Sequence, residues 1–348
     1  MKRLTRRRAR TGTAARTLMV AAALAGVIVA AATWPGRPGA RAASAVAGAA
    51  ASSDIAGETR QLEIGGAVIT VNLAAGRPDL PSQRIFAWVT RAARAVTMYY
   101  GGFPVARADV EVRVAEGRDG VFHGFTYDPD SGILTTRIAV GQHTTDAELE
   151  SDWMMTHELV HMAFPSMKDE HHWIEEGIAT YVEPIARVED GQLPMNSVWQ
   201  QLVDGLPKGE PEAGDEGLDH THTWGRTYWG GAMYCLLADV GIRRATNNRM
   251  GLQDALRGIV AAGGSMEQDW SIERALETGD KATGTTVLMD LYEKMKAAPA
   301  PVDLAQMWRE LGVVTTGASV TFRDDAPYAA IRRAITEKPR ARLAPVKP

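Results

Sequence analysis

The chain has 348 residues, 45% of them hydrophobic and 23% charged, which is typical of a globular protein with one large or two smaller domains. Nine of the 38 Lys and Arg residues lie among residues 1–45, which hold no acid, so the rest of the chain has 29 basic against 42 acidic residues, a net charge of −13. This acidic body argues against nucleic acid as the main partner, and the single cysteine, Cys235, excludes an internal disulfide framework and a cysteine-based zinc cluster.

Residues 1–45 have the layout of an export signal. A basic head, MKRLTRRRAR, precedes 15 uncharged apolar residues, Leu18 to Ala32, and small residues at A-x-A spacing end at Ala42 or Ala45. A membrane-spanning helix usually needs about 20 apolar residues, so the stretch is short for a permanent anchor. An uncleaved single-pass anchor is the alternative. In either case we expect the protein to work outside the cytoplasm, secreted, periplasmic or at the cell surface.

Residues 46–57 are small and polar and predict a linker, and residues 58–145 predict a strand-rich lobe. Gly-Gly between two β-prone runs indicates a hairpin over 62–73, and apolar residues at helical spacing indicate a helix over 81–101. Strands are expected over 110–117 and, on both sides of an Asp-Pro-Asp-Ser-Gly turn, within 122–141. The last strand, ILTTRIAVGQ (133–142), is a candidate edge for a substrate peptide bound by β-addition.

Residues 146–337 predict a helical lobe, because helical patterns cover roughly 146–164, 172–186, 227–240, 251–262, 282–297 and 303–311. Residues 187–223, rich in Gly, Pro and acids, are expected to form a long loop. A short strand in VTTGASVTF, a helix near 327–336 and a disordered tail over 338–348 complete the chain. Strands followed by helices predict an α+β fold of two lobes with a cleft between them.

The stretch MTHELVHMAF contains His157, Glu158 and His161, the pattern H-E-x-x-H. Two histidines four residues apart share one face of a helix, so both imidazoles can bind the same metal ion. Glu158 points about 100° away, beside the metal, where it can act as general base toward a water molecule. A catalytic zinc typically has three protein ligands. A third histidine six places after His161 is excluded, because Met167 stands there.

Downstream, HHWIEEGIATYVEP carries Glu176 fifteen residues after His161, on a second predicted helix. HELVH followed by WIEEGIATY resembles the gluzincin zinc metallopeptidases, which include aminopeptidase-N-like and glycyl-aminopeptidase-like enzymes and whose second motif is W-x-x-E-G-x-A. The resemblance implies that Glu176, directly before Gly, is the third zinc ligand, whereas Glu175 stands in a variable position. It also implies a thermolysin-like fold, a Zn²⁺ cofactor and hydrolysis of peptide or protein substrates.

Those families carry Y-x-x-G on a later helix, which Tyr228 and Gly231 match here. Tyr228 would donate its hydroxyl to the oxyanion of the tetrahedral intermediate, although a core tyrosine is the structural alternative. His220 and His222 could supply that hydrogen bond instead, and an exposed loop pair is an equal interpretation of them.

Four residues beside the metal motifs have mainly structural interpretations. His171 and His172 precede the helix of Glu176 and are interpreted as cap or surface residues. Thr180, one turn beyond Glu176, is a candidate for hydrogen-bonding support of a ligand. Trp173 is expected to pack the helix.

Two departures from aminopeptidase N relatives limit the functional expectation. The gap between His161 and Glu176 is shorter, and strand 133–142 lacks the G-x-M-E-N segment whose glutamate holds a substrate amino terminus, so aminopeptidase activity of that kind is not supported. The expected function is a zinc-dependent peptidase. The alternatives are another zinc hydrolase on the same scaffold and a non-catalytic envelope protein that binds peptides, against which the intact Glu158 argues.

Overall fold

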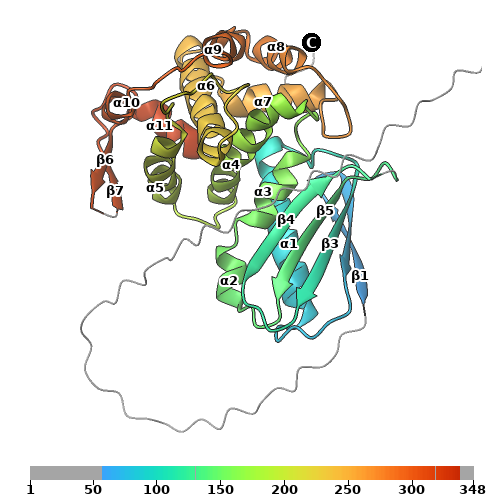
Figure 1. Cartoon of the computed structure of the whole chain (residues 1–348). Coiled ribbons are helices and arrows are strands. Elements are labelled where there is room, and N and C mark those ends of the chain that lie inside the picture. The colour runs from blue at the N-terminus through green and yellow to red at the C-terminus, as the bar shows by residue number, and fades with distance from the viewer. Residues whose placement is uncertain (1–56, 130, 318, 338–348) are drawn as a thin grey trace, which may run out of the picture.

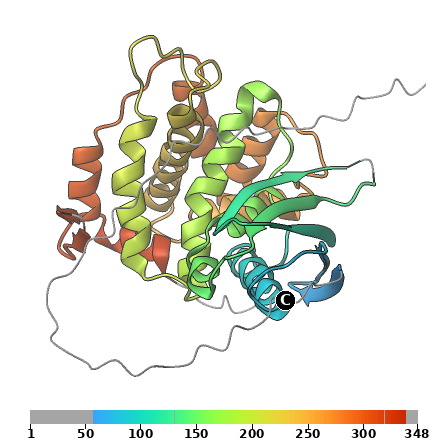
Figure 2. The ribbon, with the colours of Figure 1, turned by 60° about the horizontal axis from the view of Figure 1, so that its bottom comes forward.

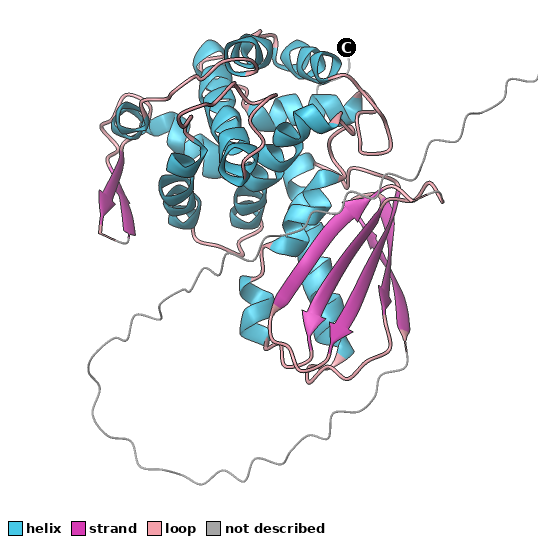
Figure 3. Ribbon diagram, in the orientation of Figure 1, coloured by secondary structure: helices cyan, strands magenta, loops and turns pink. Residues whose placement is uncertain are grey.

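The computed structural model describes residues 57–129, 131–317 and 319–337. Five strands gather in one part of the molecule and most of the helices in the other, in agreement with the predicted α+β class (Figures 1 and 3). The predicted export signal or anchor (1–45), the linker up to residue 56 and the tail (338–348) lie outside the described residues. Among the residues that the structure describes, no helix is long and apolar enough to cross a membrane.

The strands form a sheet in the order β1-β2-β3-β5-β4. β1 (Glu58–Ile64) and β2 (Ala67–Leu73) make the predicted antiparallel hairpin, and alternate residues of β2 are buried. The turn between them is formed by Gly65 and Gly66, whose φ angles of 58° and 85° are ones that glycine adopts without steric cost. β2, β3 (Arg107–Ala115) and β5 (Thr135–Gly141) are parallel, whereas β4 (Val121–Tyr127) runs antiparallel to β5.

β4 is an edge of the sheet, and the expectation that strand 133–142 forms this edge is wrong. β4 follows β3 in the chain, but among the described strands it pairs with β5 alone, so β5 lies between β3 and β4. The register shifts between Phe122 and Phe125, and His123 has a positive φ of 52°, so β4 carries a bulge at this point. Strand order depends on long-range pairing, which no local pattern reveals.

The remaining described chain is mainly helical. Its α-helices are α1 (Ser82–Tyr100), α2 (Asp146–Ser151), α3 (Met154–His161), α4 (His172–Glu189), α5 (Met195–Gly205), α6 (Gly231–Ala245), α7 (Leu252–Ala261), α8 (Ile272–Thr283), α9 (Val287–Met295), α10 (Leu304–Leu311) and α11 (Ala329–Thr336). α1 contacts β1 and β2 and also α3 and α4, so it joins the sheet to the helical part (Figures 1 and 2).

Two sequence-based predictions within residues 146–223 are wrong. The helix predicted over 146–164 is two helices, because the Asp152 carboxylate accepts hydrogen bonds from the backbone N–H groups of Met154 and Met155 and so begins a new helix. The predicted loop 187–223 contains α5 and a 3₁₀ turn, η2 (Leu206–Gly209). The buried residues of α5 include Val198, Trp199 and Leu202, a helical spacing that the surrounding Gly, Pro and acidic residues obscure.

At the C-terminal end, α8 was not predicted, and the predicted helix 282–297 begins only at Val287. Gly284, with φ 69°, ends α8 in the left-handed conformation and separates it from α9. The single strand expected in VTTGASVTF is instead an antiparallel hairpin of β6 (Val313–Thr316) and β7 (Ser319–Phe322).

Candidate metal centre

His157 and His161 on α3 meet Glu176 on α4 in the interior of the molecule. Glu176 Oε2 lies 3.1 Å from His157 Nε2 and 3.7 Å from His161 Nε2. Tetrahedral zinc with bonds of about 2.0–2.1 Å holds its ligand atoms about 3.3 Å apart, so these three atoms fit one zinc ion. In the described ranges, this is the one group of three or more His, Cys, Asp or Glu close enough to hold a metal.

The electrostatics of the three residues suit metal binding. Burial lowers the pKa of His161 to about 4, so this imidazole is neutral, the form that binds metals. Burial alone would also lower the pKa of His157, but the hydrogen bond and negative charge of Glu176 raise it overall. Burial opposes ionisation of Glu176, but His161 and the hydrogen bonds from the neighbouring histidines keep its pKa well below its usual range. Glu176 is therefore an anionic carboxylate facing two imidazoles.

Glu158 lies buried between α3 and the edge strand β4. The Thr126 hydroxyl on β4 lies 2.8 Å from the Glu158 backbone oxygen and 3.2 Å from Oε2 of its side chain. A Cβ atom at Gly124 would lie 2.9 Å from Glu158 Cγ, so glycine at the bulge lets the strand approach the helix. Burial raises the pKa of Glu158 to about 7, which suits a group that exchanges protons near neutral pH. No sequence motif identified Thr126 or Gly124.

His172 belongs to the site, although its sequence position suggested only a cap or surface role. Its Nε2 lies 3.3 Å from Oε1 of Glu176, and its Nδ1 lies 3.3 Å from Oε2 of Glu175. Burial favours the neutral imidazole, but the two hydrogen bonds outweigh it and raise the pKa of His172 to about 10. A doubly protonated His172 can hold Oε1 of Glu176 while Oε2 faces the two other histidines. The i,i+4 spacing of His172 and Glu176 was the available sequence signal.

The neighbouring candidates lie outside the ligand set. Glu175 accepts a hydrogen bond from the backbone N–H of Met167. His171 is buried rather than exposed, and its Nδ1 lies 3.0 Å from Oδ1 of Asp219, which also accepts a hydrogen bond from the Trp173 indole. Trp173 is buried and packs α4, as predicted.

Three other candidates are not joined to the metal ligands. His220 and His222 are exposed. In the part of the chain that the structure describes, Thr180 makes no hydrogen bond to any of the three candidate ligands.

Tyr228 lies beside the candidate ligands on a π-helical turn, η3 (Gly225–Gly230), where a plain α-helix was expected. Its ring stacks on that of His157, with centroids 6.3 Å apart and planes 20° apart, and its hydroxyl interacts with Glu176. Burial raises the pKa of Tyr228, so its hydroxyl keeps its proton and can donate a hydrogen bond. Single π-helical turns frequently occur at functional sites.

Two glycines explain how Tyr228 comes so close to Glu176. Gly177 follows Glu176 on α4, and Gly231 is the first residue of α6. A Cβ atom on Gly177 would overlap the backbone of Gly231, and one on Gly231 would overlap the carbonyl oxygen of Trp173. The glycines of the E-G and Y-x-x-G motifs therefore form the close contact between α4 and the end of η3.

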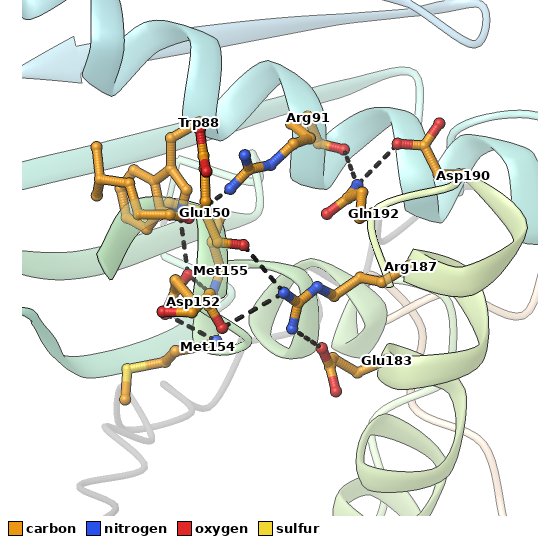
Figure 4. Close-up of polar contacts among 12 residues, drawn as sticks. Trp88, Arg91, Glu150, Asp152, Met154, Met155, Glu183, Arg187, Asp190 and Gln192 are labelled. Carbon is orange, nitrogen blue, oxygen red and sulfur yellow. Dashed lines mark hydrogen bonds and ion pairs between the residues drawn. The ribbon is translucent and has the colours of Figure 1, made fainter. Parts of the chain in front are cut away.

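A buried polar network fixes α3 relative to α4 (Figure 4). Arg187 on α4 donates to Glu183 Oε1 at 2.9 Å and to the backbone oxygens of Glu150 and Ser151 at 3.2 and 3.3 Å. These oxygens end α2, immediately before Asp152, whose carboxylate caps α3. The helix that carries two candidate ligands is thereby attached to the helix that carries the third.

Neither a protein-family model nor a curated protein sequence matches the chain. Among solved structures, an aminopeptidase N family protein from Idiomarina loihiensis is similar with a TM-score of 0.58 and 14% identity, over 74% of this chain and 49% of that one. An M1 zinc metallopeptidase from Deinococcus radiodurans aligns with a TM-score of 0.45 and 15% identity, over 71% and 54% of the two chains. The chain thus spans about half the length of these proteins. The first similarity confirms, at the level of fold, the aminopeptidase-N-like resemblance of the motifs.

Proposed function

We propose that the protein is a zinc-dependent peptidase. The observation that carries the proposal is that Oε2 of Glu176 faces Nε2 of both His157 and His161, with the Glu158 carboxyl beside them. His157, His161 and Glu176 would hold Zn²⁺. When bound, the ion would lower the pKa of a water molecule and polarise the carbonyl of the substrate.

The chain supplies the proton transfers and the hydrogen bonds of the proposed reaction. Glu158 accepts a proton from the attacking water and delivers it to the leaving amine, and its pKa of about 7 supports both steps. Tyr228, which keeps its proton, donates a hydrogen bond to the carbonyl oxygen as negative charge develops there. The edge strand β4 lies against Glu158, so a substrate strand added to β4 would bring its backbone to the site.

We also propose where the substrate binds in the fold and where the protein works in the cell. The substrate would bind in a thermolysin-like cleft between the part that contains the sheet and the helical part. Residues 1–45 support export, with membrane anchoring if the segment is retained, and peptides or proteins outside the cytoplasm would then be the substrates.

Substitution Glu158→Gln tests the proposal. Metal analysis of the purified protein should find about one zinc per chain in both forms, because Glu158 is not among the three ligands. Hydrolysis of a mixed peptide library should fall at least about 100-fold in the variant, since the general base is lost. Glu277→Gln, an exposed change on α8, is the matched control. A folded protein without zinc, or full hydrolysis by Glu158→Gln, would overturn the proposal.

A further inference from the structure

Large apolar side chains are rarely exposed in the described part of the chain, and two of the exceptions lie at the metal centre. Trp224 is 61% exposed and Trp153 is 50% exposed, whereas the other exposed ones, Met195 and Val314, lie on α5 and β6. Tryptophan offers one of the largest apolar surfaces of any side chain, so leaving two indoles in water forgoes substantial burial.

The two tryptophans are the ends of one row of rings. Trp153 meets His157 edge to face, with centroids 5.4 Å apart and planes 88° apart. His157 stacks on Tyr228, and Tyr228 stacks on Trp224 with centroids 5.9 Å apart and planes 27° apart. The middle of the row therefore holds a candidate zinc ligand and the candidate oxyanion donor, and both ends are exposed.

In the part of the chain that the structure describes, no neighbour gives the outer surface of either indole a structural role. Each precedes a helical segment, Trp153 before α3 and Trp224 before η3, and neither caps that segment through its side chain. Each indole packs on one side against a ring of the site, and half or more of it remains in water. The exposed part of each indole is therefore free of contact with the described residues.

We propose that Trp153 and Trp224 are specificity-determining residues that receive large apolar or aromatic side chains of a peptide, on residues adjoining the bond to be cleaved. The inference rests on the proposed function and deepens it by naming the substrate class. The indoles lie at opposite ends of the row, so the two residues that flank the bond are the ones selected. Each apolar side chain that is covered adds to affinity roughly in proportion to the apolar area removed from water.

Binding to zinc-loaded Glu158→Gln protein tests the inference without any need for turnover. The probes are peptides blocked at both ends with Phe-Leu, Ala-Ala or Arg-Lys at the centre, and the readout is Kd by calorimetry. The Phe-Leu peptide should bind at least about tenfold tighter than the Ala-Ala peptide. Adding Trp153→Ala or Trp224→Ala should weaken Phe-Leu binding about tenfold each and leave Ala-Ala binding within about twofold.

Val314→Ala, an exposed apolar residue on the remote β6–β7 hairpin, is the control and should change neither affinity (Figure 1). Equal losses for the Phe-Leu and Ala-Ala peptides, or tightest binding of the Arg-Lys peptide, would overturn the inference. Circular dichroism of each variant shows that it is folded, which the exposure of both indoles leads us to expect.

Turnover by the chain with Glu158 intact separates this inference from the proposed function. Suppose that all three peptides are hydrolysed with equal kcat/KM and that neither tryptophan change affects it. This result would contradict the role of Trp153 and Trp224 in specificity but would agree with the proposed peptidase function. If the expected differences in Kd are found but no peptide is hydrolysed, the role of Trp153 and Trp224 in binding would stand and the peptidase function would be contradicted.

Discussion

His172 Nε2 lies 3.3 Å from Oε1 of Glu176, one turn away on the same helix. The other oxygen of that carboxylate faces His157 and His161. One helix thus carries both a candidate zinc ligand and the donor that orients it. His172 is a candidate positioning residue, because it would act on a bound zinc ion through Glu176.

Replacing His172 with Ala should weaken zinc binding about 10- to 100-fold, since Glu176 loses the donor that holds its second oxygen. His172→Gln, which keeps a donor, should recover part of the loss. Competition with a chromogenic chelator measures the affinity directly. The exposed His220→Ala is the control. An unchanged zinc affinity in His172→Ala would exclude the positioning role.

Glu176 and Glu175 should respond differently to substitution by Ala. Glu176→Ala should abolish stoichiometric zinc binding, because the carboxylate facing both histidines is removed. Glu175→Ala should keep about one zinc per chain, because Glu175 contacts His172 and the backbone of Met167 rather than the two imidazoles. Metal analysis after gel filtration separates the two results, and zinc loss in Glu175→Ala alone would move the third ligand by one residue.

Arg187→Met should lower the free energy of unfolding by about 3–5 kcal/mol, because it leaves Glu183 buried without its charge partner. It also removes donors from the two carbonyls at the end of α2. Urea unfolding of the metal-free protein measures the loss. Arg323→Met breaks the pair with Asp325, in which the side chains are 65% and 71% exposed, and should cost only about 0–1 kcal/mol. Similar losses in both variants would contradict a special role for the network.

Glu189 should make the metal-free protein less stable as pH rises from about 4.5 to about 7. Burial raises its pKa to about 7, so the folded state keeps a proton that the unfolded chain releases near its ordinary pKa of 4.5. Unfolding in this window therefore releases a proton, and a higher pH favours the unfolded state. The stability that this group contributes is complete below pH 4.5 and is lost toward pH 7.

Glu189→Gln mimics the protonated acid and can keep the hydrogen bond from Gln253. Relative to the parent, it should be more stabilising at pH 8 than at pH 5, by about 1–3 kcal/mol in urea unfolding. Equal differences at the two pH values would mean that Glu189 ionises normally in the folded protein.

Elements with a strong local pattern were predictable. The hairpin of β1 and β2, the helix α1 ending at Gly101 and the helix α4 appear where alternation, helical spacing and glycine placed them. The break at Asp152 and the helix α5 were missed, because a capping side chain interrupts one apolar pattern and polar surroundings obscure the other. In the candidate site, the three ligands and Glu158 were predictable because they lie in sequence motifs. Thr126 and Gly124, which contact Glu158, were not predictable because no motif contains them.

The sequence by itself determined that His157 and His161 share a helical face, because this depends only on the local period of the helix. It also carried the E-G and Y-x-x-G motifs. Only the tertiary structure decided that β4 is the edge strand, that Thr126 reaches Glu158 and that the row of rings ends in two exposed tryptophans. These relationships join elements that are distant along the chain, so they are set by packing and strand pairing rather than by any local pattern.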